Sequence, residues 1–444
     1  MGMDIKKTRK DLTASLINQI WTCISGLLIV LLVPLFLTDE QQGYWFLFGS
    51  FAALYTFADS GFFNIILQFT AHEFAFLKLI KVKTIEGPDE YIKRISSFFR
   101  FSLKWVCIVS AIAYPIIVAV GIIYFVRDGV VQTYLMPWII YSTGFLIFFI
   151  NAAILSFIEG LNVIDIVQKT KLLMSVINTS VVILLLVFHF NIFALSVGMI
   201  VSSSLMFIFI FIKFNSIFKQ LLKEGKKYNY KWKKEVLPLF IKYAISSVTV
   251  FFTLYIYTPI MHLFHGAVYS GKVGLSFNIV NALFVISNIW IYTVTPTLNM
   301  YVEKKDWKAL DKLFYKRALL AIFTYIGIVL CMILFWNLTE RFEIPLFKMI
   351  ISRCFPLWAI MFLVGAYFIN VFDNAMTVYL TAHKKIPLLI PNILSSLMVF
   401  FLTIVIAKTM DPEYFFLGTF ITYVSFFVVN VIIFLVCKRK WHCE

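Results

Sequence analysis

The stretch ASLINQIWTCISGLLIVLLVPLFL (residues 14–37) decides the fold class, because it stays apolar for long enough to cross a bilayer. A transmembrane helix needs about 20 predominantly apolar residues. Three polar residues interrupt this stretch at i, i+4 and i+7, on one helix face: Asn18, Thr22 and Ser25. A polar face is costly in lipid unless it lines a cavity or packs on protein. The stretch therefore predicts a membrane helix that faces a polar interior.

The same polar pattern begins a second hydrophobic stretch further along the chain. Lys242, Ser246 and Thr249 repeat the i, i+4, i+7 spacing, each 224 positions after its counterpart. One polar face at the start of each half suits an interior that both halves share. We therefore expect two related helix bundles around a central cavity.

A second correspondence joins the middle of the two halves. Pro137 precedes Asn151 by 14 residues, and Pro356 precedes Asn370 by the same distance. The offset between these pairs is 219 positions, close to the 224 of the first repeat. The two repeats occur in the same order, which predicts an internal duplication about an axis along the membrane normal.

Apolar stretches of membrane-spanning length recur along the whole chain. Of its 444 residues, 61% are hydrophobic and 14% are charged, with a mean hydropathy of +0.89. This composition predicts an all-α polytopic membrane protein with about twelve transmembrane helices in two six-helix lobes around a central cavity. We expect an N-terminal lobe at 1–212, a basic linker at 213–242 and a C-terminal lobe at 243–444. The predicted spans are 14–37, 44–68, 101–126, 133–157, 172–190, 192–212, 243–264, 273–298, 318–339, 355–380, 386–407 and 414–437.

The net charge of +16 follows from membrane topology and does not indicate nucleic-acid binding. With an even number of spans, 33 of the 39 Lys and Arg residues fall on the side that holds both termini. Such a bias is the positive-inside rule, so we expect both termini to be cytoplasmic.

Polar side chains line up on the first, seventh, eighth and tenth predicted spans. Aligned stripes of this kind favour a wet cavity. The alternative is that each amide or hydroxyl only joins two helices by hydrogen bonds. The candidates for contact with a substrate are Asn18, Lys242, Thr249, Lys272, Asn278, Asn281, Asn288 and Asn370.

Two carboxylates lie deep inside predicted spans, Asp59 in the second and Asp373 in the tenth. A buried carboxylate must pair, find water or take up a proton. The functional interpretation is a cation or proton site that couples transport. The structural interpretation is a pair with Lys242 or with a helix amide, and both interpretations stay open.

The sequence carries no motif for a cofactor, a metal or catalysis. Its six cysteines are scattered without paired spacing, and His262 and His265 have no adjacent acidic or cysteine partner. No phosphate-binding loop, nucleophile elbow or zinc-protease motif is present. We expect a protein without catalytic residues, cofactor or metal, which is not an enzyme.

The beginning of the second predicted span resembles a known family. Gly43-Tyr44-Trp45, followed by Asp59-Ser60-Gly61, is similar to the Gly-Tyr/Trp opening and Asp-x-Gly element of Wzx-type flippases of polysaccharide biosynthesis. That family belongs to the multidrug/oligosaccharidyl-lipid/polysaccharide exporter superfamily. Val273-Gly274-Leu275-Ser276 at the start of the eighth span, and Thr295-Pro296 at its end, fit the same plan. Only Asp59 and Gly61 carry over as single positions.

The resemblance implies an O-antigen type of flippase in a bacterial cytoplasmic (inner) membrane, acting in lipopolysaccharide or related polysaccharide biosynthesis. Its substrate would be an undecaprenyl-diphosphate-linked oligosaccharide, and its partners would be membrane lipid and polysaccharide polymerase and chain-length proteins. Relatives often place cationic residues well inside the cavity to meet the diphosphate. Here Lys242 and Lys272 are the candidates for that contact.

Two other functions compete with a flippase. A cation-coupled multidrug exporter of the same superfamily would need anionic residues in the cavity, and Asp59 and Asp373 could serve. A membrane polysaccharide polymerase or ligase would need a large outer loop. The predicted outer loops are short, although Asp39-Glu40 keeps this alternative open.

Overall fold

The computed structural model describes residues 5–80, 82–226, 228 and 230–443, without the side chains of 5–9, 12, 23, 246, 248, 250 and 443. Almost all of the described chain is helical. Within it, ten helices are long and apolar enough to cross a membrane, or eleven if one bent pair counts as a single span. These helices confirm the predicted all-α polytopic membrane fold.

The chain forms two compact units, each built from two separate segments of the sequence. Unit 1 contains the described residues up to Leu32 together with Phe48–Phe251. Unit 2 contains Val33–Leu47 and the described residues from Phe252 onward. The chain therefore passes from one unit to the other three times. The division into lobes at 1–212 and 243–444 stays a prediction.

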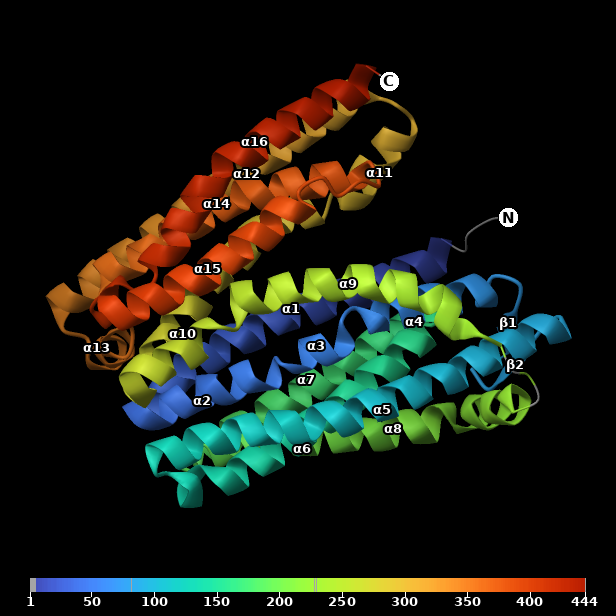
Figure 1. Cartoon of the computed structure of the whole chain (residues 1–444), viewed down its shortest axis with the longest axis horizontal. Helices are drawn as coiled ribbons and strands as arrows, with labels where there is room; N and C mark the ends of the chain where they lie inside the picture. The colour runs from blue at the N-terminus through green and yellow to red at the C-terminus, as the bar shows by residue number, and fades with distance from the viewer. Residues whose placement is uncertain (1–4, 81, 227, 229, 444) are drawn as a thin grey trace. The chain divides into compact units, whose positions relative to one another are not determined.

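Unit 1 is a helical bundle in which α5, α6 and α8 run side by side (Figure 1). Its elements are α1 (Ile5–Phe36), whose last residues belong to unit 2, the second part of α2 (Asp39–Ala52), α3 (Tyr55–Asp59), α4 (Phe62–Phe74), β1 (Lys78–Ile80), β2 (Thr84–Glu86), α5 (Asp89–Asp128), α6 (Val131–Gly160), α7 (Ile164–Val187), α8 (Phe193–Gly225) and most of α9 (Trp232–Leu254).

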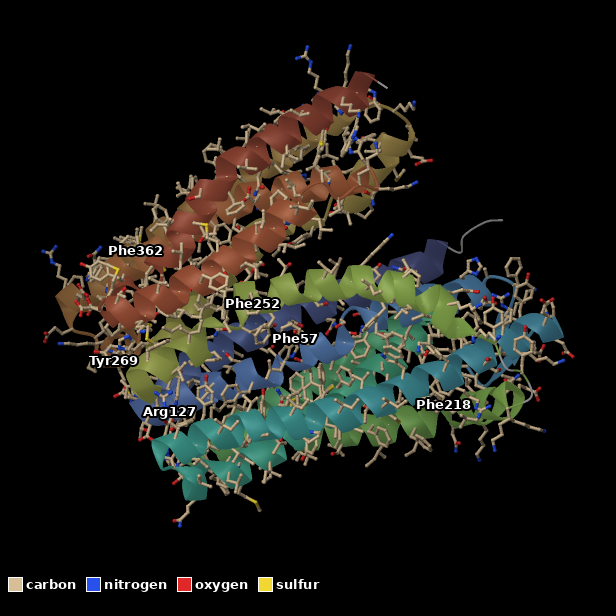
Figure 2. The ribbon with its side chains drawn as sticks, in the orientation of Figure 1. Phe57, Arg127, Phe218, Phe252, Tyr269 and Phe362 are labelled. Carbon is tan, nitrogen blue, oxygen red and sulfur yellow. The ribbon has the colours of Figure 1, made fainter. Side chains whose placement is uncertain are left out.

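Much of the predicted linker 213–242 is helical, because α8 continues to Gly225 and α9 begins at Trp232. The reason is an apolar stripe at i, i+3, i+4 and i+7, which stays buried beyond the predicted span. Phe218, which Figure 2 labels, belongs to this stripe. It stacks on Phe99 of α5, with ring centroids 5.6 Å apart. The stripe consists of Phe214, Ile217, Phe218 and Leu221.

A small β-hairpin, which the sequence analysis did not predict, follows α4. Strands β1 and β2 pair in antiparallel register, with Leu79 opposite Ile85. The side chain of Gln220 on α8 takes the place of a third strand, since it accepts from the Ile85 N–H at 2.9 Å and donates to the Ile85 carbonyl at 2.7 Å. Gly87 and Pro88 then end the hairpin and lead into α5.

Unit 2 is a second helical bundle, in which α12, α14 and α16 lie side by side (Figure 1). Its elements after α9 are α10 (Tyr257–Tyr292), which is kinked at Gly266, α11 (Thr295–Glu303), α12 (Trp307–Phe342), α13 (Pro345–Ser352), α14 (Leu357–Ala382), α15 (Leu389–Thr409), a 3-10 turn (Pro412–Tyr414) and α16 (Leu417–Cys443).

The predicted seventh span, 243–264, is not one continuous helix. Helix α9 ends at Leu254 and α10 begins at Tyr257. Pro259 explains the break, because a proline inside a helix clashes with the carbonyl four residues earlier, here that of Tyr255. With the break at this point, Pro259 lies in the first turn of α10, where a missing N–H is tolerated.

The two Pro–Asn pairs that the sequence analysis matched lie in different backbone environments. Pro137 lies inside α6, whereas Pro356 is the residue that precedes α14. Asn151 is buried and donates to the Ser203 carbonyl at 2.8 Å, while Asn370 is half-buried. The matched spacing of these residues therefore does not correspond to matched local structure.

Candidate functional site

Asp59 and Gly61, the two residues that carry the family resemblance, build a helix break in unit 1. The Asp59 carboxylate accepts the N–H of Phe63 at 2.9 Å and so caps the start of α4. Gly61 has a φ of +73°, and a Cβ there would lie 2.5 Å from the Cβ of Tyr243 on α9. The stretches on either side of the break differ in direction by 42°. The structure thus gives Asp59 a definite role in shaping the second span.

Lys242 lies on α9 beside the residue that packs against this break. The Tyr243 hydroxyl accepts from the Gln68 side chain at 3.0 Å, while Lys242 is exposed. Thr249, two turns later, donates to the Ile245 carbonyl at 3.3 Å. The side chain of Ser246 lies outside the described residues. Lys242 is therefore the residue of the predicted stripe whose charge is exposed and can contact a ligand.

Asn18 joins α1 to a polar network at the start of α7. Its amide donates to Gln168 at 3.0 Å, and Gln168 donates to Glu159 at 3.3 Å. Glu159 also forms an ion pair with Lys171 at 3.0 Å. Glu159 lines a cavity of about 480 Å³, whose other walls come mainly from apolar residues of α4 and its C-terminal end. Asn18 thus acts as a helix-joining amide, the structural alternative of the sequence analysis.

The amides of α10 and α14 meet in unit 2. Asn374 donates to the Asn288 side chain at 2.6 Å and accepts from the Tyr292 hydroxyl at 3.3 Å. Asn288 is fully buried and also donates to the Phe284 carbonyl. Tyr292 keeps about half of its surface exposed, at 51%. This cluster combines an anchored amide pair with an accessible hydroxyl, which is an arrangement that can hydrogen-bond a polar ligand.

The remaining predicted polar residues lie along the same two helices. Asn278 donates to the Gly274 carbonyl at 2.7 Å, and Asn281 and Asn370 are half-buried. Lys272 lies 5.7 Å from the ring centroid of Tyr269. It precedes Asn288 by 16 residues, which is about 24 Å along a helix. The structure therefore separates Lys272 from the amide cluster.

Asp373 points toward α16. The side-chain amide of Asn430 lies against its carboxylate, and Tyr423 of α16 is close enough to be influenced by its charge. The Oδ1 atoms of Asp373 and Asn430 are both buried without a hydrogen-bond partner among the described residues. Asn430 is only 4% exposed. Two oxygens of this kind suit a bound water, proton or small cation.

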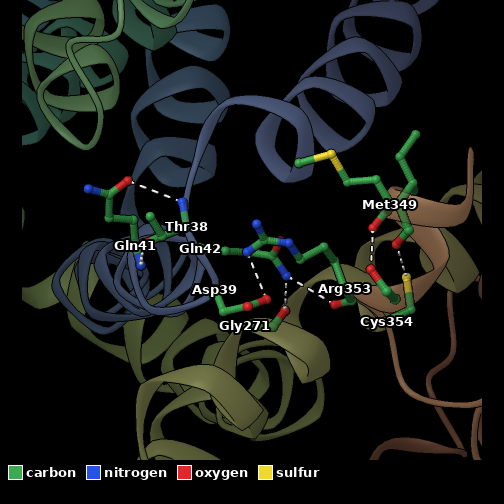
Figure 3. Close-up of polar contacts among 10 residues, drawn as sticks. Thr38, Asp39, Gln41, Gln42, Gly271, Met349, Arg353 and Cys354 are labelled. Atoms are coloured by element: carbon green, nitrogen blue, oxygen red, sulfur yellow. Dashed lines mark hydrogen bonds and ion pairs between the residues drawn. The ribbon is translucent and has the colours of Figure 1, made fainter. Parts of the chain in front are cut away.

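A tight contact that the sequence analysis missed joins the start of α2 to α10 and α13 within unit 2 (Figure 3). Gln42 is buried and donates to the carbonyls of Gly271 at 2.9 Å and Arg353 at 3.2 Å. Asp39 forms an ion pair with Arg353 at 2.7 Å. A Cβ at Gly43 would lie only 2.0 Å from the Ala267 carbonyl oxygen. Small residues that let two backbones approach are the signal from which this contact could have been predicted.

The similarity of this chain to known proteins is structural. No family model and no curated protein matches it. It is similar in structure to an inward-facing multidrug resistance MATE family transporter of the MOP superfamily, with a TM-score of 0.63 and 12% identity over 97% of this chain and 98% of that one. An outward-facing MATE family transporter gives a TM-score of 0.55 and 11% identity over 99% and 96%.

A third similar structure is a MOP superfamily transporter from Pyrococcus furiosus, described as having a binding pocket of reverse polarity that suggests a different function. Its TM-score is 0.54, with 11% identity over 98% of this chain and 96% of that one. At such low identity these likenesses show the fold, over nearly the full length of each chain. The protein therefore has the fold of the MATE family transporters of the MOP superfamily.

Proposed function

We propose that the protein carries an undecaprenyl-diphosphate-linked oligosaccharide from the cytoplasmic to the outer face of a bacterial inner membrane by alternating access. The fold of the similar transporters and the resemblance of residues 43–63 to Wzx-type flippases support this proposal. A sugar diphosphate cannot cross about 30 Å of hydrocarbon unaided. Polar groups on membrane helices can shield it while the lipid tail stays in the bilayer.

The main support for the proposal is that both intramembrane carboxylates already contact groups of the protein itself. Asp59 caps α4, and Asp373 faces Asn430 on α16. An exporter of cationic drugs needs acidic groups that are available to its substrate. The groups that remain along α10 and α14 are mainly neutral amides and hydroxyls, which suit the hydroxyl groups of a sugar.

The proposed roles follow from the chemistry of each side chain. Lys242 and Lys272 attract the diphosphate, as exposed or half-buried cations. Asp373 with Asn430 takes up the coupling proton or cation. The sugar is bound by groups of α10 and α14 that keep exposed surface, while buried Asn288 holds Asn374 in place: Asn278, Asn281, Tyr292, Asn370 and Asn374.

Lys242→Ala should abolish surface glycan while the amount of folded protein in the membrane stays unchanged. Lys242 is exposed, so its removal should leave the packing of α9 intact. Lys234→Ala is the matched control, because Lys234 is also an exposed lysine of α9 but lies nearer its start. Surface glycan and membrane protein would be measured for both variants. Wild-type glycan in Lys242→Ala would remove this residue from the phosphate contact.

Deletion of the whole chain tests the proposed function. Surface polysaccharide would be measured together with the lipid-linked oligosaccharide on each membrane face. Loss of the glycan, with complete repeat units trapped on the cytoplasmic face, is the expected result. Intermediates that accumulate on the outer face would instead indicate a polymerase or ligase. Unchanged glycan with increased accumulation of cationic drugs would indicate the alternative, a cation-coupled multidrug exporter.

A further inference from the structure

The last residues of α16 are held against α12 and α14 by stacked rings, which we name the carboxyl-terminal clasp: Trp307, Tyr379, His383, Trp441 and His442. Trp307, the first residue of α12, stacks on His442 with ring centroids 4.7 Å apart and 13° between the planes. It also stacks on His383 at 5.8 Å and 16°. Trp441 lies 4.8 Å from the ring of His383. Three helices of unit 2 therefore meet through two imidazoles.

A buried hydroxyl connects one of these imidazoles to an acid. Tyr379 is fully buried, and its hydroxyl lies 2.7 Å from a carboxylate oxygen of Asp311 and 2.8 Å from Nε2 of His442. Asp311 is ion-paired with Lys438 at 2.8 Å, so it accepts the hydroxyl proton. The hydroxyl oxygen then accepts from His442, which places a proton on Nε2 of that ring.

The second imidazole has its proton placed by the backbone. Nδ1 of His383 lies 3.1 Å from the carbonyl oxygen of Tyr379, so Nδ1 carries the proton and donates it. Nε2 of His383 is buried without a hydrogen-bond partner among the described residues. A second proton on this ring would therefore create a buried charged N–H. The clasp fits a neutral His383.

The charged groups around the rings include both lysines and carboxylates. Lys385 lies 4.8 Å from the Trp441 ring, and Lys438 lies 4.7 Å from the Tyr315 ring. Among the described residues, Asp311 pairs with Lys438, Glu303 on α11 pairs with Lys384 at 3.3 Å, and Asp306, which precedes Trp307, accepts the Ala309 N–H. The rings therefore lie among cations whose neighbouring acids are engaged.

These groups shift the titration of His383 toward the neutral ring. Burial lowers the pKa of His383, and His442 and Lys385 lower it further, whereas the Tyr379 carbonyl and Asp311 raise it. A base whose pKa is lowered in the folded state contributes its full stability above the unfolded value of about 6.5, and loses it as the pH falls below that value.

We propose that His383 and His442 make the clasp a pH sensor, which holds the segment from Lys438 to His442 against α12 and α14 when the rings are neutral and releases it on acidification. The ligand of this site is the proton. The inference goes beyond the proposed function and does not depend on it, because attachment of the segment is measured without transport.

The test places a spin label on a Lys440→Cys variant of the full chain, in a background without other cysteines, in lipid nanodiscs. Lys440 is exposed, so the label reports on the segment without entering the clasp. Its mobility would be recorded by EPR from pH 8 to pH 5. Below about pH 6.5 the ratio of mobile to immobilised label should rise by up to about tenfold per pH unit. A label at Lys408, an exposed residue of α15, should not respond.

Three variants make the outcome decisive. Trp307→Ala should mobilise the label at every pH, which shows that the label senses the clasp. His383→Asn keeps a donor for the Tyr379 carbonyl, because its Nδ2 takes the place of Nδ1, but it cannot titrate. The label should therefore stay immobilised with most of the pH response lost. A label that never responds to pH in the native chain, although Trp307→Ala mobilises it, would overturn the proposal. A full response in the His383→Asn, His442→Gln double variant would do the same.

Discussion

Gly43→Ala should abolish transport and lower the free energy of unfolding by about 1–3 kcal/mol, the usual effect of overpacking. The added methyl carbon would lie 2.0 Å from the Ala267 carbonyl oxygen and 2.6 Å from its carbonyl carbon. Both atoms belong to the backbone of α10, so no change of side-chain rotamer relieves the clash. The segment Val33–Leu47 would have to move away from α10, and the bonds from Gln42 would be lost with it.

Gly49→Ala is the matched control, because it introduces the same methyl group into the same helix. A Cβ at Gly49 has no neighbour within 4 Å, so the variant should be neutral or slightly more stable. Both variants would be compared by thermal unfolding in detergent and by surface glycan. Normal glycan and stability in Gly43→Ala would show that α2 and α10 do not need this close approach.

Asp373→Asn should reduce transport at least about tenfold, since an amide cannot supply the charge that binds a coupling ion. The substitution keeps the shape of the side chain, so the protein should still fold and reach the membrane. The partnerless oxygens of Asp373 and Asn430 are the reason to place coupling there. Initial transport rates in vesicles, with and without an imposed proton or sodium gradient, measure the effect.

Asp59→Asn provides the contrast within the same protein. Asn caps a helix about as well as Asp, so this variant should keep transport within about twofold of the native rate. Asp59→Ala removes the acceptor for the Phe63 N–H and should lower the unfolding free energy by about 1 kcal/mol. If Asp59→Asn abolishes transport and Asp373→Asn does not, the coupling carboxylate is Asp59 and our assignment is wrong.

The sequence predicted the helices better than it predicted their ends. Hydropathy located the spans because lipid requires about 20 apolar residues, wherever those helices pack. It extended the seventh span across Pro259, where α9 gives way to α10, because hydropathy does not register a missing N–H. It also treated 213–225 as linker, although the buried stripe that includes Phe214 and Phe218 continues α8.

For the candidate site too, the sequence predicted some features and missed others. Amides such as Asn288 were predicted as ligand groups from their shared helix face, and the structure joins Asn288 to Asn374 on another helix. Asn18 carries the same amide, yet it is bonded to Gln168. One-dimensional spacing reports which face a side chain is on, but not which neighbour that face meets. The choice between a cavity and a helix contact therefore lies outside the sequence pattern.

By itself, the sequence determined that this is a helical membrane protein, because apolar length and the cost of unpaired backbone groups in lipid act locally along the chain. Only the tertiary structure decided that Val33–Leu47 packs with unit 2, that Asp59 caps α4, and that Asp373 faces Asn430. These outcomes depend on partners far away in sequence. A contact as close as that of Gly43 with Ala267 forms only where the two surfaces fit together. The periodicity of one segment carries no information about the shape of its partner.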